Sequence, residues 1–141
     1  MRTKTSTWME VDARFSAIAE DGFEKTKTEK YVVDAMSFTE AEKKTIDFLK
    51  DEKNLKVVAI KQARYNELVF KDNESNDDKW WKVKVKVFCG DSEKPSTVQE
   101  LVQASSVIDA QSTIAKLYNG IMADYSIATI DETKVIDIIV E

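Results

Sequence analysis

The sequence contains no histidine, one cysteine, one proline and three glycines. Without histidine there is no imidazole general base, no Ser–His or Cys–His nucleophile and no histidine metal ligand. A single cysteine excludes an internal disulfide framework and a thiolate zinc site. Three glycines supply nothing like the glycine-rich loop that holds nucleotide phosphates. We therefore expect a protein that is not an enzyme and that needs no cofactor and no metal.

Long hydrophobic runs are also missing, since no apolar stretch approaches the roughly 18–20 residues of a membrane span. Residues 1–7 are basic but lead into no apolar segment, unlike a signal peptide. With the single thiol, this predicts a cytoplasmic protein without a membrane partner. The 141 residues are 43% hydrophobic and 33% charged, which is typical of one globular domain. The net charge of −5 disfavours duplex DNA binding by the whole surface but leaves room for one basic face.

The chain resembles two copies of one unit. Residues 8–15 align with 80–87, and residues 32–37 align with 101–106. Further matches relate residues 55–60 to 125–130 and residues 67–69 to 137–139, and the small changes of offset fall in expected loops. This pattern predicts a single domain over residues 1–141, built from repeats at 8–70 and 80–140 that are joined by a polar linker at 71–79.

Each half is expected to contain two strands, a helix and two more strands. The predicted elements of the first half are strands 8–17, 31–36, 55–60 and 65–70 and a helix from 38 to about 51. Those of the second half are strands 80–89, 98–105, 125–130 and 135–140 and a helix over 106–119. The fold class is therefore α+β: two tandem ββαββ repeats share one core, in which two helices pack on an antiparallel sheet.

Serine residues mark the two helix starts. Ser37 with Glu40 three residues later forms a capping box, and Ser106 is followed in the same way by Asp109. We expect both serines to be N-caps. The apolar side chains of the first helix define one stripe that should bury against the sheet. Its members are Phe38, Ala41, Thr45, Phe48 and Leu49, and the equivalent stripe of the second helix includes Val107, Ala110, Ile114, Leu117 and Tyr118.

Several segments resemble an uncharacterised family, domain of unknown function 4494. They include residues 33–42 (VDAMSFTEAE), 80–85 (WWKVKV), 101–105 (LVQAS) and 130–133 (IDET), and together they span nearly the whole chain. Proteins of that family are met in gut Bacteroidales and in their phages and mobile elements. The resemblance implies a small stand-alone protein from such an element. It implies no activity, so no catalytic residue can be assigned from it.

Two groups of reactive side chains have ordinary structural explanations. The carboxylates of residues 72–78 could be imagined as a Ca²⁺ loop or a hydrolytic pair, but the segment lacks the central glycine of an EF-hand. We interpret it as a solvated linker. Cys89 ends an apolar alternation and is expected to be a small buried hydrophobe, because no histidine is available to activate it.

A stripe of lysines is the most informative feature. Trp80, Lys82, Lys84 and Lys86 fall on one face of the expected strand. Ammonium groups beside an aromatic ring suit a nucleic-acid strand, since charges meet phosphates and the ring stacks on a base. The alternative is structural: the equivalent strand of the first half carries Glu10 and Asp12, so the lysines could be their cross-strand partners. We favour this pairing.

The last segment, residues 135–140 (VIDIIV), is apolar on both faces and must be buried or pair with another chain. This predicts a homodimer through sheet edges. The sequence as a whole favours a non-enzymatic binding or interaction protein of a phage-like element. A single-stranded nucleic-acid-binding accessory protein is the alternative.

Overall fold

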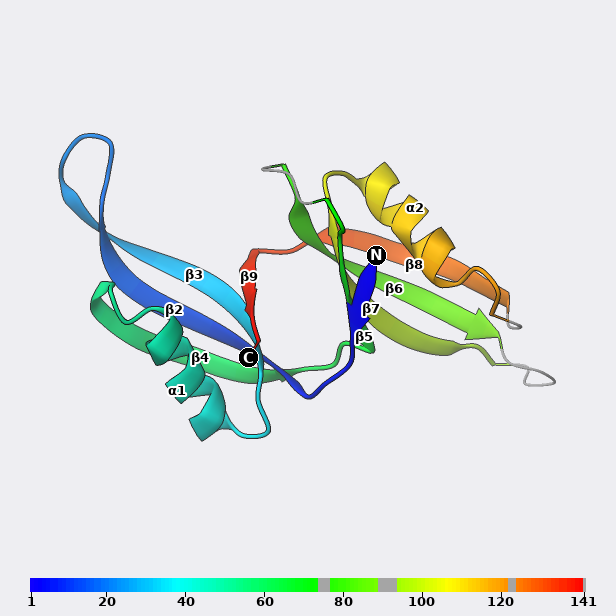
Figure 1. Ribbon diagram of the computed structural model, residues 1–141, viewed down its shortest axis with the longest axis horizontal. Helices are drawn as coiled ribbons and strands as arrows, with labels where there is room; N and C mark the ends of the chain where they lie inside the picture. Colours follow the sequence, from blue (N-terminus) through cyan, green and yellow to red (C-terminus); the bar gives the residue numbers. More distant parts are fainter. Residues whose placement is uncertain (74–76, 89–93, 122–123, 141) are drawn as a thin grey trace. The chain divides into compact units, whose positions relative to one another are not determined.

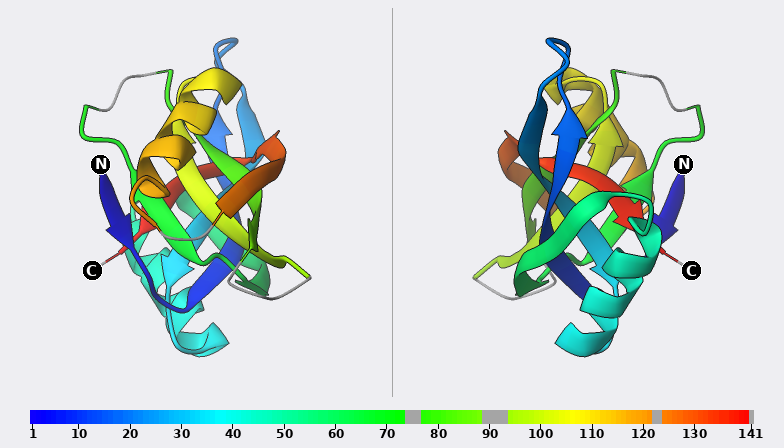
Figure 2. Two further views of the ribbon diagram at one scale, coloured as in Figure 1. Left: turned by 90° about the vertical axis from the view of Figure 1, so that its right-hand side faces the viewer. Right: turned by 90° about the vertical axis from the view of Figure 1, so that its left-hand side faces the viewer.

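The computed structural model describes residues 1–73, 77–88, 94–121 and 124–140 (Figure 1). Its contacts divide the chain into two compact units. Unit 1 consists of Met1–Thr5 and Tyr65–Thr133, and unit 2 consists of Ser6–Arg64 and the segment from Lys134 to the C-terminus. Each unit contains one sheet and one helix that lies along one face of it (Figures 1 and 2).

Unit 2 contains a four-stranded sheet in the order β4-β2-β3-β9. Strand β2 is antiparallel to both of its neighbours, whereas β9 is parallel to β3. The turn between β2 and β3 contains Gly22, whose φ of 83° is readily adopted only by glycine. The elements are β2 (Trp8–Ile18), β3 (Glu24–Asp34), α1 (Phe38–Phe48), β4 (Lys53–Ala63) and β9 (Val135–Ile139).

Unit 1 contains a five-stranded sheet in the order β1-β5-β7-β6-β8. Strand β6 is antiparallel to β7 and β8, and β5 is parallel to β7. The elements are β1 (Arg2–Lys4), β5 (Glu67–Phe70), β6 (Lys79–Phe88), β7 (Ser96–Ala104), α2 (Val107–Leu117) and β8 (Asp124–Glu132). The short strand β1 was not expected from the sequence. It pairs with β5, and the Arg2 guanidinium lies 4.7 Å from the centre of the Phe70 ring.

The α+β class and the two helices are as expected, but the sheet arrangement differs. There are two mixed sheets instead of one antiparallel sheet. The units also differ from the sequence halves: β5 from the first half pairs with β7, and β9 from the second half pairs with β3. Each parallel pairing needs a long connection, so no local sequence signal announces it. The ββαββ repeat and the single domain stay predictions.

Both helices begin where the sequence places them. Ser37 Oγ accepts a hydrogen bond from the Glu40 amide (3.1 Å), and Ser106 Oγ accepts one from the Asp109 amide (3.1 Å). In a standard capping box the acidic side chain accepts a hydrogen bond from the amide of the N-cap residue. Here it accepts one from the amide of the residue before the N-cap. The Glu40 carboxylate accepts from the Met36 amide at 2.9 Å. Both serines are therefore N-caps, and two amide groups at each helix start are satisfied.

The predicted apolar stripe of α1 is only partly buried. Ala41, Thr45 and Leu49 are buried, but Phe38 and Phe48 are 56% and 50% exposed. Small side chains at the contact let the helix approach the sheet closely, and this leaves the two large rings at the margin. The expectation that Phe38 and Phe48 belong to the core was therefore wrong. In α2, Ala110, Ile114 and Tyr118 are buried while Val107 is 47% exposed.

The long strands β4 and β8 each form one edge of their sheets, and each contains a bulge. Val58 of β4 is the extra residue opposite Asp12 and Ala13 of β2. Ala128 of β8 is the extra residue opposite Lys84 and Val85 of β6. Cys89 and residues 74–76 of the predicted linker lie outside the described residues. Within the described parts of the chain, no helix has the length and apolar content needed to cross a membrane.

Candidate functional site

The lysine stripe lies on the face of the β6 sheet opposite α2. Val83 and Val85 of β6 pack in the core beneath the helix. Because side chains alternate along a strand, the lysines between them point to the other face, about 6.7 Å apart. Lys82 and Lys84 are half-buried and Lys86 is exposed. We call Lys82, Lys84 and Lys86 the cationic stripe.

Polar side chains flank the cationic stripe on both neighbouring strands. Lys84 lies opposite Gln99 of β7 and Thr129 of β8. Lys86 lies opposite Thr97 and Ser126 in the same way. Hydroxyl and amide groups therefore accompany Lys84 and Lys86 across three strands, which is the composition expected of a surface that binds phosphate oxygens. Lys82 instead lies opposite Asp131 and the buried Leu101. The sequence alone does not point to these flanking residues, because it does not show which strands adjoin β6.

Within the described residues, the cationic stripe has no ion-pair partner. Asp131 of β8 is directly opposite Lys82, yet no salt bridge forms between them. The nearby Lys79, by contrast, pairs with Glu132 at 2.7 Å, and the hydrogen bond to this carboxylate raises the pKa of Lys79. The three adjacent ammonium groups are therefore available to bind an anion. One carboxylate, that of Asp131, lies opposite the cationic stripe.

The expected cross-strand pairing with Glu10 and Asp12 was wrong. Strands β2 and β6 lie in different sheets, so they are not adjacent strands. The acids of β2 are paired within their own sheet: Glu10 lies 3.5 Å from both Lys30 and Lys61, and Asp12 lies 3.6 Å from Lys30. Glu10 and Asp12 are therefore neutralised by lysines of their own sheet and not by the cationic stripe.

Trp80 shares the face of the cationic stripe but is only 5% exposed. Its ring packs edge-on against Phe70, with centroids 5.3 Å apart and an interplanar angle of 84°. A ring held in this way does not offer a face on which a base can stack. The site is therefore a set of charges and polar groups without the aromatic platform that the sequence predicted.

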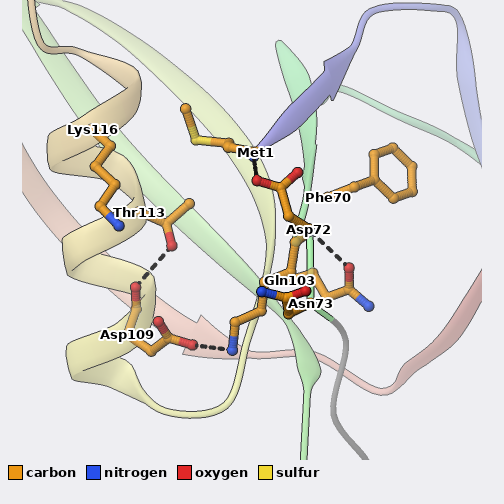
Figure 3. Close-up of a pocket in the computed structure, with 9 residues that line it drawn as sticks. Met1, Phe70, Asp72, Asn73, Gln103, Asp109, Thr113 and Lys116 are labelled. Carbon is orange, nitrogen blue, oxygen red and sulfur yellow. Dashed lines mark hydrogen bonds and ion pairs between the residues drawn. The ribbon is translucent and has the colours of Figure 1, made fainter.

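A second polar region borders α2. A shallow pocket of about 180 Å³ is lined by residues of β5, β7 and α2, and Figure 3 shows Asp109, Thr113 and Lys116 along one side of it. Lys71 joins Asp109 (2.8 Å) to Asp78 (2.9 Å). Its ammonium lowers the pKa of Asp109. The Asp78 side chain is 2% exposed, so this part of the expected solvated linker is a buried ion-pair partner.

These contacts make the pocket a structural cluster rather than a binding site. Its bridging Lys71 is already paired with Asp109 in the lining and with the buried Asp78, and Asp72 accepts a hydrogen bond from the N-terminal amine (Figure 3). In the described part of the chain, no group of three or more acidic or cysteine side chains is placed to hold a metal ion. The cationic stripe is therefore the surface best suited to a ligand.

The comparisons with known proteins give one match. The model of a family described as "Domain of unknown function (DUF4494)" matches residues 7–141. No curated protein and no solved structure matches the chain. The match covers both units and all strands except β1.

Proposed function

Because this chain belongs to the DUF4494 family, whose function is unknown, we propose a role for it from its geometry: a non-enzymatic binding protein whose cationic stripe contacts the phosphate backbone of single-stranded nucleic acid. The observation that carries the proposal is the row of three ammonium groups that have no ion-pair partner among the described residues, two of which are flanked by hydroxyl and amide side chains. Such a surface neutralises phosphates and releases counterions, which supplies affinity without reading sequence.

The buried Trp80 limits the kind of recognition. Because Trp80 is packed away, binding should depend mainly on charge and should be weak, sensitive to salt and indifferent to base identity. Phe88, at the end of β6 on the same face, is 39% exposed and offers one ring at the margin of the cationic stripe. We expect this role to belong to a phage-like or mobile element, in keeping with the resemblance noted from the sequence. A cytoplasmic location is part of the same proposal, because the ligand is there.

We further infer that the chain is an internal duplication whose halves have diverged on this face. The equivalent sheet orders β4-β2-β3-β9 and β8-β6-β7-β5 support it. So do the bulges, which lie opposite residues 12 and 13 in one sheet and residues 84 and 85 in the other. At equivalent positions, β2 carries Glu10 and Asp12 where β6 carries Lys82 and Lys84. A reversal of charge at matched positions favours a specialised role for the second half.

The experiment is a binding titration with a fluorescently labelled single-stranded oligonucleotide at low salt. Replacing Lys82, Lys84 and Lys86 together with Gln should abolish or strongly weaken binding. The matched control replaces Lys43, Lys50 and Lys56 of unit 2, which are exposed and carry the same total charge. It should bind like the wild type. Equal losses in both triple variants would show non-specific attraction only and would contradict the proposal.

Asp131 offers a test in the opposite direction. It is the carboxylate opposite Lys82, so Asp131→Asn should strengthen binding by removing a repulsive charge from the site. A site elsewhere on the molecule would not respond to this substitution.

A second candidate function is self-association through the outer strands. Strand β4 carries Lys53, Lys56 and Lys61 and no acid, whereas β8 carries Asp124, Asp131 and Glu132 and no base. These opposite charges favour β4 of one copy against β8 of another in a homodimer. The bulge in each strand confines such pairing to a short stretch. Analytical ultracentrifugation tests it: Lys53→Glu with Lys56→Glu should dissociate a dimer, and an unchanged mass would exclude this interface.

A further inference from the structure

A fully buried carboxylate lies inside unit 1, on the opposite face of the sheet from the cationic stripe. Glu100 of β7 alternates with Val98 and Val102, which pack in the core beneath α2, and its exposed fraction is 0%. Its Oε1 accepts hydrogen bonds from Asn66 Nδ2 (2.9 Å) and from the Tyr118 hydroxyl (3.0 Å). Its Oε2 is buried and has no hydrogen-bond partner.

A second carboxylate is placed beside it. Glu67 of β5 is the register partner of Glu100 in the parallel β5–β7 pair, and it shares its face of the strand with buried Val69. The Oε2 atom of Glu67 is likewise buried without a partner. Two adjacent side chains therefore each direct one unsatisfied acceptor oxygen into the interior, an arrangement that costs free energy unless a donor is supplied.

The described partners of Glu100 on neighbouring elements include no cation. Helix α2 contributes the neutral Tyr118 hydroxyl at its C-terminal end, and β8 contributes Tyr125, whose ring stacks on Tyr118 with centroids 4.9 Å apart. The residue of β6 opposite Glu100 is Val83. Within the described residues, no lysine or arginine forms an ion pair with either glutamate. Burial raises the pKa of Glu100, and the charge of Glu67 raises it further, whereas the bonds from Asn66 and Tyr118 lower it.

We propose that Glu100 is a protonated carboxyl in the interior of unit 1 and that unit 1 is thereby sensitive to pH. The proton turns the unpartnered Oε2 of Glu100 into a donor and keeps a charge out of the core. Its loss places a charge in the core beside the half-buried Glu67. Because Tyr118 joins Glu100 to the end of α2, the C-terminal turn of this helix should loosen first.

The sign of the effect follows from the direction of the pKa shift. The folded chain holds the proton more tightly than the unfolded chain, where the carboxyl has its ordinary pKa of 4.5. The contribution of the Glu100 carboxyl to stability is therefore fully present below that value and is lost as the pH rises through the pKa of Glu100 in the folded chain. This is opposite to the behaviour of a carboxylate held by a salt bridge.

The direct experiment is a carbon-13 NMR titration of the full chain with labelled glutamate carboxyl groups. We expect one carboxyl signal to titrate well above the others and to disappear in Glu100→Gln. Glu67→Gln should lower the midpoint of that titration by removing the neighbouring charge. Tyr118→Phe should raise it by removing a donor to the ionised form. The control Glu42→Gln, at an exposed position of α1, should change neither.

If Glu100→Gln fails to fold, the opposite shifts expected for Glu67→Gln and Tyr118→Phe still test the proposal. A second measurement follows the melting temperature between pH 5 and 9. The melting temperature of the wild type should fall relative to that of Glu67→Gln as the pH rises. The proposal is overturned if all glutamate carboxyls titrate near their ordinary pKa, or if Glu67→Gln leaves the high titration unchanged.

Discussion

Ser37 and Ser106 show how much a single side chain can specify about this fold. Each hydroxyl accepts a hydrogen bond from the amide at the third helical position. The acidic side chain at that position accepts one from the amide of the residue before the cap. All the atoms involved lie within five residues of one another in the sequence. This locality explains why both helix starts could be predicted from the sequence.

We expect Ser37→Ala to destabilise the chain by about 0.5–2 kcal/mol, because the Glu40 amide loses its acceptor. Chemical denaturation with a helix-sensitive probe measures the change. Ser37→Asp is the matched control, since aspartate is also a good N-cap, and its stability should stay within a few tenths of a kcal/mol of the wild type. If the alanine and aspartate variants were equally destabilised, the cap would not be the cause.

Glu100 is a residue whose burial, but not whose neighbours, could be predicted from the sequence. The alternation of Val98, Glu100 and Val102 places the carboxyl on the inner face of its strand, so its burial could have been inferred. Its neighbours could not, because Glu67 and Tyr118 come from β5 and α2 and meet it only through tertiary packing. A buried acid becomes a functional candidate only once its partners are known.

At the scale of the element, helix α1 contacts its sheet through small side chains. Ala41 is fully buried beneath α1, and Thr45 directs its hydroxyl to the Ala41 carbonyl (2.8 Å). The 3.6-residue periodicity correctly indicated one buried side of the helix. It could not tell how wide the buried side is: Ala41, Thr45 and Leu49 are buried as predicted, whereas Phe38 and Phe48 are not.

Ala41→Leu should therefore cost about 1–3 kcal/mol, because the added atoms enter a closely packed contact between α1 and its sheet. The control is Lys43→Leu on the exposed side of the same helix, which should change stability by no more than about 0.5 kcal/mol. Thermal or denaturant unfolding compares the two variants. Similar stabilities would mean that α1 does not pack closely through Ala41.

At the scale of the whole molecule, the chain passes between units more than once. Unit 2 is completed by β9, whose residues follow all of unit 1 in the sequence. The apolar pattern of residues 135–140 predicted a strand that is buried or pairs with another chain. In β9, Val135, Ile138 and Ile139 are buried, whereas Ile136 is 56% exposed. The partner of β9 could not be predicted, since a parallel pairing across about a hundred residues leaves no local trace.

The pairing of β9 with β3 has a consequence that can be measured. Ile139 is in the core of unit 2, so Ile139→Ala should destabilise that unit by about 2–5 kcal/mol even though it lies near the C-terminus. Hydrogen exchange at the amides of β3 reports the loss. Ile136→Ala is the control, because Ile136 is 56% exposed and its replacement should have little effect. Unchanged exchange in β3 after Ile139→Ala would place β9 elsewhere.

The central claim, that the cationic stripe binds a nucleic-acid backbone, is tested most directly by the salt dependence of binding. The slope of the logarithm of the association constant against the logarithm of salt concentration counts the phosphates that are neutralised. Replacing Lys82, Lys84 and Lys86 with Gln should make the slope for a single strand shallower by about 2, at about 0.7 per phosphate. The Lys43, Lys50 and Lys56 control should keep the slope of the wild type. A slope that is unchanged by the first set, or reduced equally by both, would contradict the account.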